Sequence, residues 1–138
     1  MDAWTIERDA ARLALRERDL GGLIDALLDE GDVEEAWSVA HEDPDWDPGS
    51  HRRLRLAEAR EPQRPEQALP WYMLVVDELL LETGRRAYAR AIPVLKRASR
   101  AADAAGQNEW FATQIADLRE QHRRRPTLIA MLDKAGLG

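Results

Sequence analysis

Residues 65–106 read PEQALPWYMLVVDELLLETGRRAYARAIPVLKRASRAADAAG, two long runs divided by Gly84. In the first run, apolar residues nearly complete the circle of a helical projection, which is typical of a helix buried at the centre of a domain. In the second run, apolar residues such as Tyr88, Ile92 and Leu95 share one face and arginines lie elsewhere, which predicts an amphipathic helix with a basic exposed side. Because a short break makes two helices antiparallel neighbours, the stretch predicts a helical hairpin.

The same alternation of apolar helical runs and short breaks extends in both directions from this hairpin. The breaks carry Gly, Pro or Asp and fall at 31–32, 43–49, 61–65, 84, 106 and 125–126. Asp32 opens an Asp-x-x-Glu pattern that is typical of a helix start. Residues 4–18 also read as a helix, and no run has the period of a strand. We expect Pro70 and Pro93, which lie inside helical runs, to bend or locally break their helices.

The length of 138 residues favours a single domain over the whole chain. Its expected parts are N-terminal helices over 1–43, a loop over 44–49, and a helical-repeat body over 50–138. The loop region holds three acids at alternate positions and two prolines, so it is the widest hinge candidate in the chain.

Just inside the second helix of a predicted hairpin, a small residue is followed four positions later by a small or aromatic one, at Ala36–Ala40 and Ala68–Tyr72. Phe111–Ile115 matches this pattern only loosely. In this respect the chain resembles the tetratricopeptide (TPR) class of helical repeats, in which a small residue lets two helices approach closely. Because the spacing between these sites is irregular, the chain is TPR-like rather than a set of true repeats. The resemblance implies an all-α, right-handed α-solenoid-like stack of antiparallel hairpins with about seven helices.

A second resemblance covers residues 54–137, through segments such as LAEA at 56–59, PEQAL at 65–69 and YARA at 88–91. Its most distinctive segments are HRRRP at 122–126 and LDKAGL at 132–137. This region resembles the helical C-terminal part of bacterial SWIM zinc-finger proteins. The Cys-x-Cys and Cys-x-His zinc ligands of that family are missing, so its zinc and finger contacts do not carry over. The resemblance implies a helical scaffold region in a bacterial cytoplasm.

Cysteine is absent from the sequence. Disulfides, thiolate metal sites and thiol nucleophiles are therefore excluded, and a reducing cytoplasm is the expected location. No apolar stretch approaches the roughly 20 residues that a membrane-spanning helix needs. We expect a cytoplasmic chain without a membrane partner.

Charge divides the sequence into an acidic and a basic part. Residues 1–50 hold 15 Asp and Glu against 4 Arg, a net charge of −11, whereas residues 51–138 hold 11 acids against 16 Arg and Lys, a net charge of +5. This asymmetry is compatible with packing between the two parts, with a basic face for an acidic partner, with head-to-tail association, or with solvated helix surfaces that have no partner.

No constellation of residues predicts a metal site or a cofactor. Asp43, Asp45 and Asp47 begin like a calcium-binding loop, but Pro48 stands where that loop requires glycine and Leu54 where it requires glutamate. The histidines at 41, 51 and 122 are isolated in sequence, although the first two could meet across the acidic loop as a fortuitous site.

Enzymatic motifs are missing as well. There is no nucleophile elbow and no glycine-rich phosphate loop. Asp77, Glu78 and Glu82 lie on the most apolar helix, where burial raises carboxyl pKa values. The favoured interpretation is that they form a solvent-exposed strip or salt bridges to Arg85 or Arg86. We predict that the chain is not an enzyme.

Candidate binding residues are therefore sought among exposed cations and aromatics. Three arginines at 123–125 end a predicted helix, where the dipole favours cations, and with the arginines of 85–100 they could form a basic face. Of the five tryptophans, we expect four to pack inside, with Trp110 beside Phe111, and only Trp46 to be exposed. The predicted partner-binding residues are Arg53, Arg86, Arg90, Arg97, Arg123, Arg124, Arg125 and Trp46.

These observations predict a non-enzymatic protein–protein interaction or scaffold module that binds a protein or an acidic peptide. The alternative is a nucleic-acid-associated accessory protein that uses the basic C-terminal half. The acidic total charge and the lack of aromatic residues between the arginines make nucleic acid the less favoured partner. A homo-oligomer also stays open.

Overall fold

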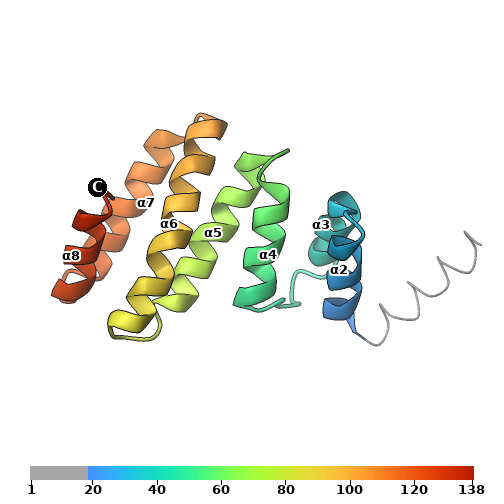
Figure 1. Ribbon diagram of the computed structural model, residues 1–138, viewed down its shortest axis with the longest axis horizontal. Coiled ribbons are helices and arrows are strands. Elements are labelled where there is room, and N and C mark those ends of the chain that lie inside the picture. The colour runs from blue at the N-terminus through green and yellow to red at the C-terminus, as the bar shows by residue number, and fades with distance from the viewer. Residues whose placement is uncertain (1–18) are drawn as a thin grey trace, which may run out of the picture. The chain divides into compact units, whose positions relative to one another are not determined.

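The computed structural model describes residues 19–138, and all regular structure in that range is helical (Figure 1). Its seven helices are α2 (Leu20–Asp29), α3 (Val33–His41), α4 (Ser50–Arg60), α5 (Pro65–Leu79), α6 (Arg85–Ala105), α7 (Asn108–Gln121) and α8 (Pro126–Lys134). The prediction of an all-α fold with about seven helices is confirmed. The helix expected over 4–18 lies outside the described residues.

Within the described residues the chain divides into two compact units, residues 19–52 and residues 53–138, and each is described by itself. The division falls within the first turn of α4. No helix among residues 19–138 is long and apolar enough to cross a membrane.

In the first unit, α2 and α3 form a hairpin around a small apolar core. Leu23, Ile24 and Leu27 are almost fully buried against Ala36 and Val39. The turn between the helices contains Gly31 at φ 81°, a conformation that glycine adopts without strain. The predicted start of α3 is confirmed, because the backbone N–H of Glu35 donates a hydrogen bond to Oδ1 of Asp32 at 3.3 Å.

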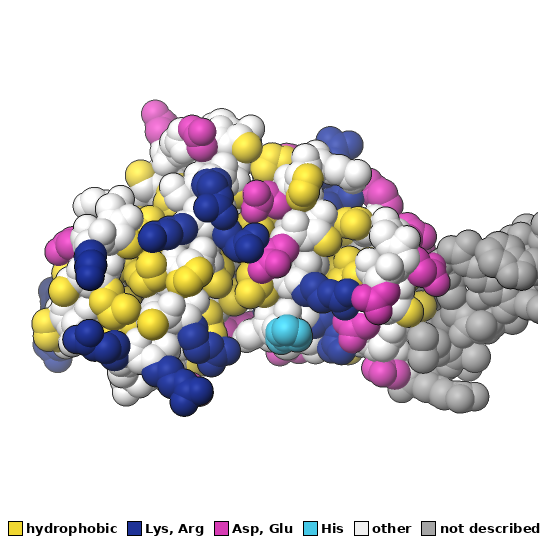
Figure 2. Space-filling view, in the orientation of Figure 1, with side chains coloured by type: hydrophobic (Ala, Val, Ile, Leu, Met, Phe, Trp, Pro, Cys, Tyr) yellow, Lys and Arg dark blue, Asp and Glu magenta, His cyan; other side chains and the backbone are white. Residues whose placement is uncertain are grey.

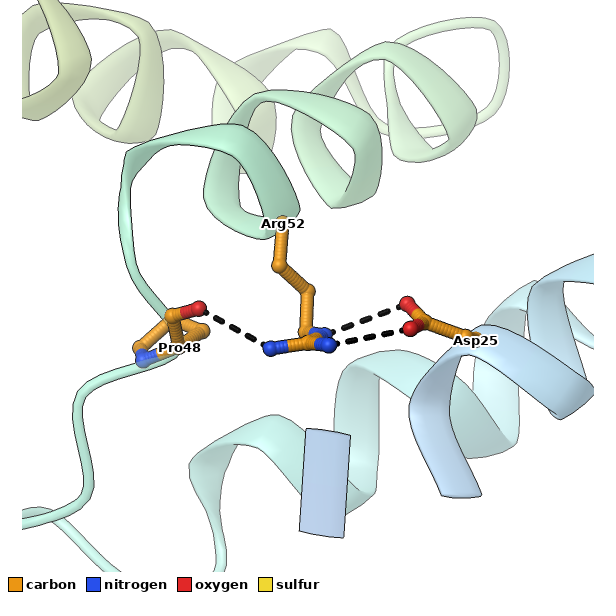
Figure 3. A network of polar contacts seen from close by, with 3 residues as sticks. All are labelled: Asp25, Pro48 and Arg52. Carbon is orange, nitrogen blue, oxygen red and sulfur yellow. Dashed lines mark hydrogen bonds and ion pairs between the residues drawn. The ribbon is translucent and has the colours of Figure 1, made fainter. Parts of the chain in front are cut away.

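One arginine ties the loop before α4 to α2 (Figure 3). The Arg52 guanidinium donates to both carboxylate oxygens of Asp25 at 3.1 and 2.9 Å and to the carbonyl oxygen of Pro48 at 3.2 Å. A Cβ atom on Gly21 would stand 2.6 Å from this guanidinium. The lack of a side chain at Gly21 therefore makes room for the arginine.

In the second unit the helices alternate between two layers (Figure 1), with α4, α6 and α8 nearer the viewer and α5 and α7 behind them. Helix α6 is central, since it packs against α5, α7 and α8. The core is a continuous cluster in which α5 contributes Leu69, Tyr72 and Val76 and α6 contributes Ala91 and Leu95, all of them fully buried. Helix α5 is apolar on nearly all sides because it is buried at the centre of this unit.

Polar contacts join α4 to α5 at the edge of this core. The hydroxyl of Tyr72 donates to Oε1 of Glu61 at 2.5 Å, and Nε of Arg60 donates to Oε1 of Gln67 at 2.7 Å. Burial, together with the bond to Glu61, raises the pKa of Tyr72. The hydroxyl therefore stays protonated and keeps its role as a donor.

The two internal prolines do not interrupt their helices. Pro70 lies within α5 and Pro93 within α6, and both helices run continuously past them. The local breaks that we considered are therefore absent from α5 and α6. Helix α5 ends earlier than the sequence indicates, at Leu79, whereas α6 ends as expected, with Gly106 in the left-handed conformation at φ 67°.

Candidate binding face

Helix α6 concentrates positive charge on its exposed side. It carries six Arg and Lys against one Asp, a net charge of +5 over one helix. Most apolar residues of α6 are buried in the core, so the cations are left on the opposite side. The exposed cations of α6 together with one from α8 are called the basic face: Arg85, Arg86, Arg90, Lys96, Arg100 and Lys134.

A shallow hollow with an apolar floor lies within the basic face. Its floor comes from Ala89, Ile92 and Pro93 of α6 and from Met131 and Ala135 near the end of α8. Its charged lining residues are all cations, Arg85, Lys96 and Lys134. Figure 2 shows dark blue side chains spread around yellow apolar ones over α6 and α8. The hollow therefore suits an apolar side chain from a segment that carries negative charge beside it.

Two of the predicted binding residues lie on the basic face and a third lies at its edge. Arg86 and Arg90 are exposed one turn apart on α6, and their side chains make no ion pair within residues 19–138. Arg97 is half-buried, and its Nε lies 3.8 Å from Oε1 of Glu58 on α4. Arg86 and Arg90 are thus available to a partner, whereas Arg97 already has one.

Arg53 does not reach the basic face. Its side chain is only 13% exposed, it forms an ion pair with Glu78 of α5, and its guanidinium lies 5.8 Å from the ring centre of Trp71. This arginine joins α4 to α5. Glu78, which the sequence allowed to pair with the arginines at the start of α6, pairs with Arg53 instead.

The three consecutive arginines separate into three different environments. Arg125 donates to the carbonyl oxygen of Leu80 at 2.8 Å, just beyond the end of α5, and lies 6.0 Å from the ring centre of Tyr88. Arg123 pairs with Glu120 at 3.0 Å on the surface. Arg124 is exposed, with no side-chain hydrogen bond or ion pair in the described part of the chain. The triplet therefore does not act as one patch.

The prediction that Trp46 is the exposed tryptophan and Trp110 a core residue is wrong in both parts. Trp46 is half-buried in the loop before α4, in the first unit. Trp110 is 38% exposed, whereas Phe111 and Ile115 are buried. One residue along a helix turns a side chain by 100°, so the inward position of Phe111 directs Trp110 away from the core.

Sequence reasoning missed two cations of the basic face and the apolar floor between them. Lys96 lies on the same side of α6 as Arg85 and Arg100, so the helical projection alone could have found it. Lys134 and Met131 come from α8, and no local pattern predicts that α8 packs beside α6. The hollow is therefore a product of tertiary packing.

The acidic loop uses its carboxylates internally. Oδ1 of Asp43 accepts the backbone N–H of Asp45, and Oδ1 of Asp47 accepts that of Gly49, both at 2.9 Å. Such bonds are common where aspartate starts a turn. Within residues 19–138, no three His, Asp or Glu side chains are grouped as metal ligands would be.

His122 and Asp77 are neighbouring groups whose pKa values are shifted in opposite directions. His122 is 9% exposed, and burial, followed by the nearby charge of Arg125, lowers its pKa against the opposing influence of Asp77. Partial burial raises the pKa of Asp77, and the charge of His122 opposes that shift. Both groups lie at the contact between α5 and the turn before α8, apart from the basic face.

Comparison of the chain with family models, with curated proteins and with solved structures finds no match. The basic face and its hollow are therefore interpreted from their own geometry.

Proposed function

We propose that the chain is a non-enzymatic protein–protein interaction module whose basic face binds an acidic, amphipathic helix of a partner protein. The observation that carries the proposal is the hollow between α6 and α8, in which an apolar floor is lined by cations and by no acid. An apolar side chain of the partner would enter the hollow, and acidic residues on either side of it would face Arg86, Arg90 and Lys96.

The spacing of the cations supports a helical partner. Positions 85 to 100 of α6 extend over about 22 Å, the length of a helix of about 15 residues. Exposed charge pairs stabilise a complex weakly one at a time, so the cations would mainly select and orient an acidic partner. The apolar contact would supply the larger part of the affinity.

The alternation of α4, α6 and α8 with α5 and α7 supports the TPR-like character of the second unit, in which the first helix of each hairpin would line the binding surface. The resemblance to the helical region of SWIM zinc-finger proteins stays a prediction, and with it the location in a bacterial cytoplasm.

The proposal is tested by the affinity for a labelled probe peptide, measured by fluorescence anisotropy. The probe is a helix of about 15 residues with glutamates flanking one central leucine. Arg86→Glu/Arg90→Glu should weaken binding at least about tenfold, because two attractive contacts become repulsive. Arg124→Glu is the matched control, since it reverses an exposed arginine outside the basic face, and its affinity should stay close to that of the parent chain.

Single-stranded RNA of the same net charge separates the proposal from nucleic-acid binding. If RNA binds more tightly than the peptide, and its affinity falls steeply between about 50 and about 200 mM salt, the basic face is a phosphate-binding surface and the proposal is wrong. Equal loss of peptide binding in the Arg124 control would also contradict it, because binding would then follow total charge.

A further inference from the structure

The layer opposite the basic face is acidic. Helices α5 and α7 together hold six Asp and Glu against one Arg, a net charge of −5. Helices α6 and α8 together hold seven Arg and Lys against two Asp, a net charge of +5. The exposed acids of α5 and α7 are called the acidic face: Glu66, Asp77, Glu109, Asp117 and Glu120.

The acidic face also has a hollow with apolar walls. Pro70 of α5 and Trp110 of α7 line it together with Glu66 and Glu109, and it has no cationic lining residue. Trp110 is 38% exposed, and Leu74, one turn after Pro70, is 46% exposed. Large apolar side chains in contact with water next to a hollow are typical of interaction surfaces.

Neither carboxylate of this hollow is neutralised within the described part of the chain. Glu66 and Glu109 are exposed and form no ion pair among residues 19–138. Elsewhere on the acidic face, Glu120 pairs with Arg123 and Asp77 lies near His122. The uncompensated negative charge is therefore centred on the hollow beside Trp110.

The two faces complement each other in charge and in character. One offers an apolar floor with cations at its edge, and the other offers exposed apolar side chains with acids at their edge. We propose that the basic face of one copy of this chain docks on the acidic face of a second copy. The inference rests on the proposed function, because it identifies the acidic partner of the basic face as another copy.

Such an interface is heterologous, since each copy contributes a different surface to it. Each copy keeps one unused face after a contact forms, so the association continues with concentration instead of stopping at a dimer. Because the contacts join acidic side chains of one copy to cations of the other, salt should weaken the association.

Two variants and their mixture test the inference. Arg86→Glu/Arg90→Glu reverses two charges of the basic face, and Glu66→Gln/Glu109→Gln neutralises the hollow of the acidic face without introducing a bulkier group. The mass of each is followed by sedimentation velocity at low salt over increasing protein concentration. Circular dichroism checks that each variant is folded, and Arg124→Gln serves as the control.

The parent chain and the control should increase in mass with concentration, and each variant alone should remain monomeric. An equimolar mixture should form a complex of two chains and no larger species, because each variant retains the face that the other lacks. A parent chain that stays monomeric at every concentration would overturn the inference, and so would a mixture that stays monomeric or variants that associate like the parent.

The probe peptide separates failure of this inference from failure of the proposed function. The Glu66→Gln/Glu109→Gln variant should bind the peptide as the parent does, since its basic face is intact. Peptide binding by a parent chain that never self-associates would refute only the second-copy inference. Loss of both activities would refute the proposed function as well.

Discussion

Truncation of Arg125 should destabilise the protein strongly, whereas truncation of its neighbour Arg124 should not. Arg125 donates a charged hydrogen bond of 2.8 Å to the carbonyl oxygen of Leu80 and lies 6.0 Å from the ring centre of Tyr88. A charged hydrogen bond contributes about 1.5–3 kcal/mol, and the half-buried position favours the lower end. The cation–π contact adds about 0.5 kcal/mol. Arg125→Ala should therefore cost about 2 kcal/mol.

The assay is urea unfolding followed by circular dichroism and tryptophan fluorescence. With a slope of about 2 kcal/mol per molar urea, Arg125→Ala should lower the midpoint by about 1 M. Arg124→Ala should change the free energy of unfolding by no more than about 0.5 kcal/mol. Equal effects of the two substitutions would refute the reasoning, because they would show that the capping of α5 by Arg125 contributes nothing beyond its charge.

Three further predictions follow from the core, a helix end and a buried histidine. Leu95→Ala, at a fully buried position of α6, should lower the free energy of unfolding by about 2–5 kcal/mol in the same urea assay, and a loss below about 1 kcal/mol would contradict its burial. Gly106→Ala should cost about 1 kcal/mol, since φ is 67° while no atom lies within 4 Å of the added Cβ; an unchanged midpoint would argue against that backbone conformation. The lowered pKa of His122 means that the unfolded chain takes up a proton at higher pH than the folded chain, so stability should fall as the pH drops from about 6.5 through the folded pKa. His122→Gln should flatten that part of a stability-versus-pH curve, and a curve of unchanged slope would show that other groups cause the loss.

Local sequence patterns were sufficient to predict the helices and the positions of most of their ends. Asp32 predicted the start of α3 because a side-chain oxygen at that position satisfies a backbone donor of the next turn. Gly106 predicted the end of α6 because it takes the left-handed conformation without strain. Trp110 was misjudged because it neighbours an apolar run whose inward face is one residue away.

The binding residues were only partly predictable, since exposure and pairing depend on contacts between helices. Arg86 and Arg90 follow from the projection of α6 alone. Nothing local in the sequence distinguishes Arg53 and Arg125 from them. Yet Arg53 is held by Glu78 of α5, and Arg125 by the carbonyl oxygen of Leu80 just beyond the end of α5. No local pattern separates a bridging arginine from an exposed one.

The most direct test of the proposed binding face is to map the probe peptide on the isotope-labelled protein by amide chemical-shift changes. The account predicts that the changed amides lie in residues 89–96 of α6 and 131–135 at the end of α8, around the hollow. Changes confined to the turn at residues 122–125 or to residues 19–52 would contradict it. So would a spectrum that stays unchanged at about 1 mM peptide, where even a weak complex of that dissociation constant is half formed.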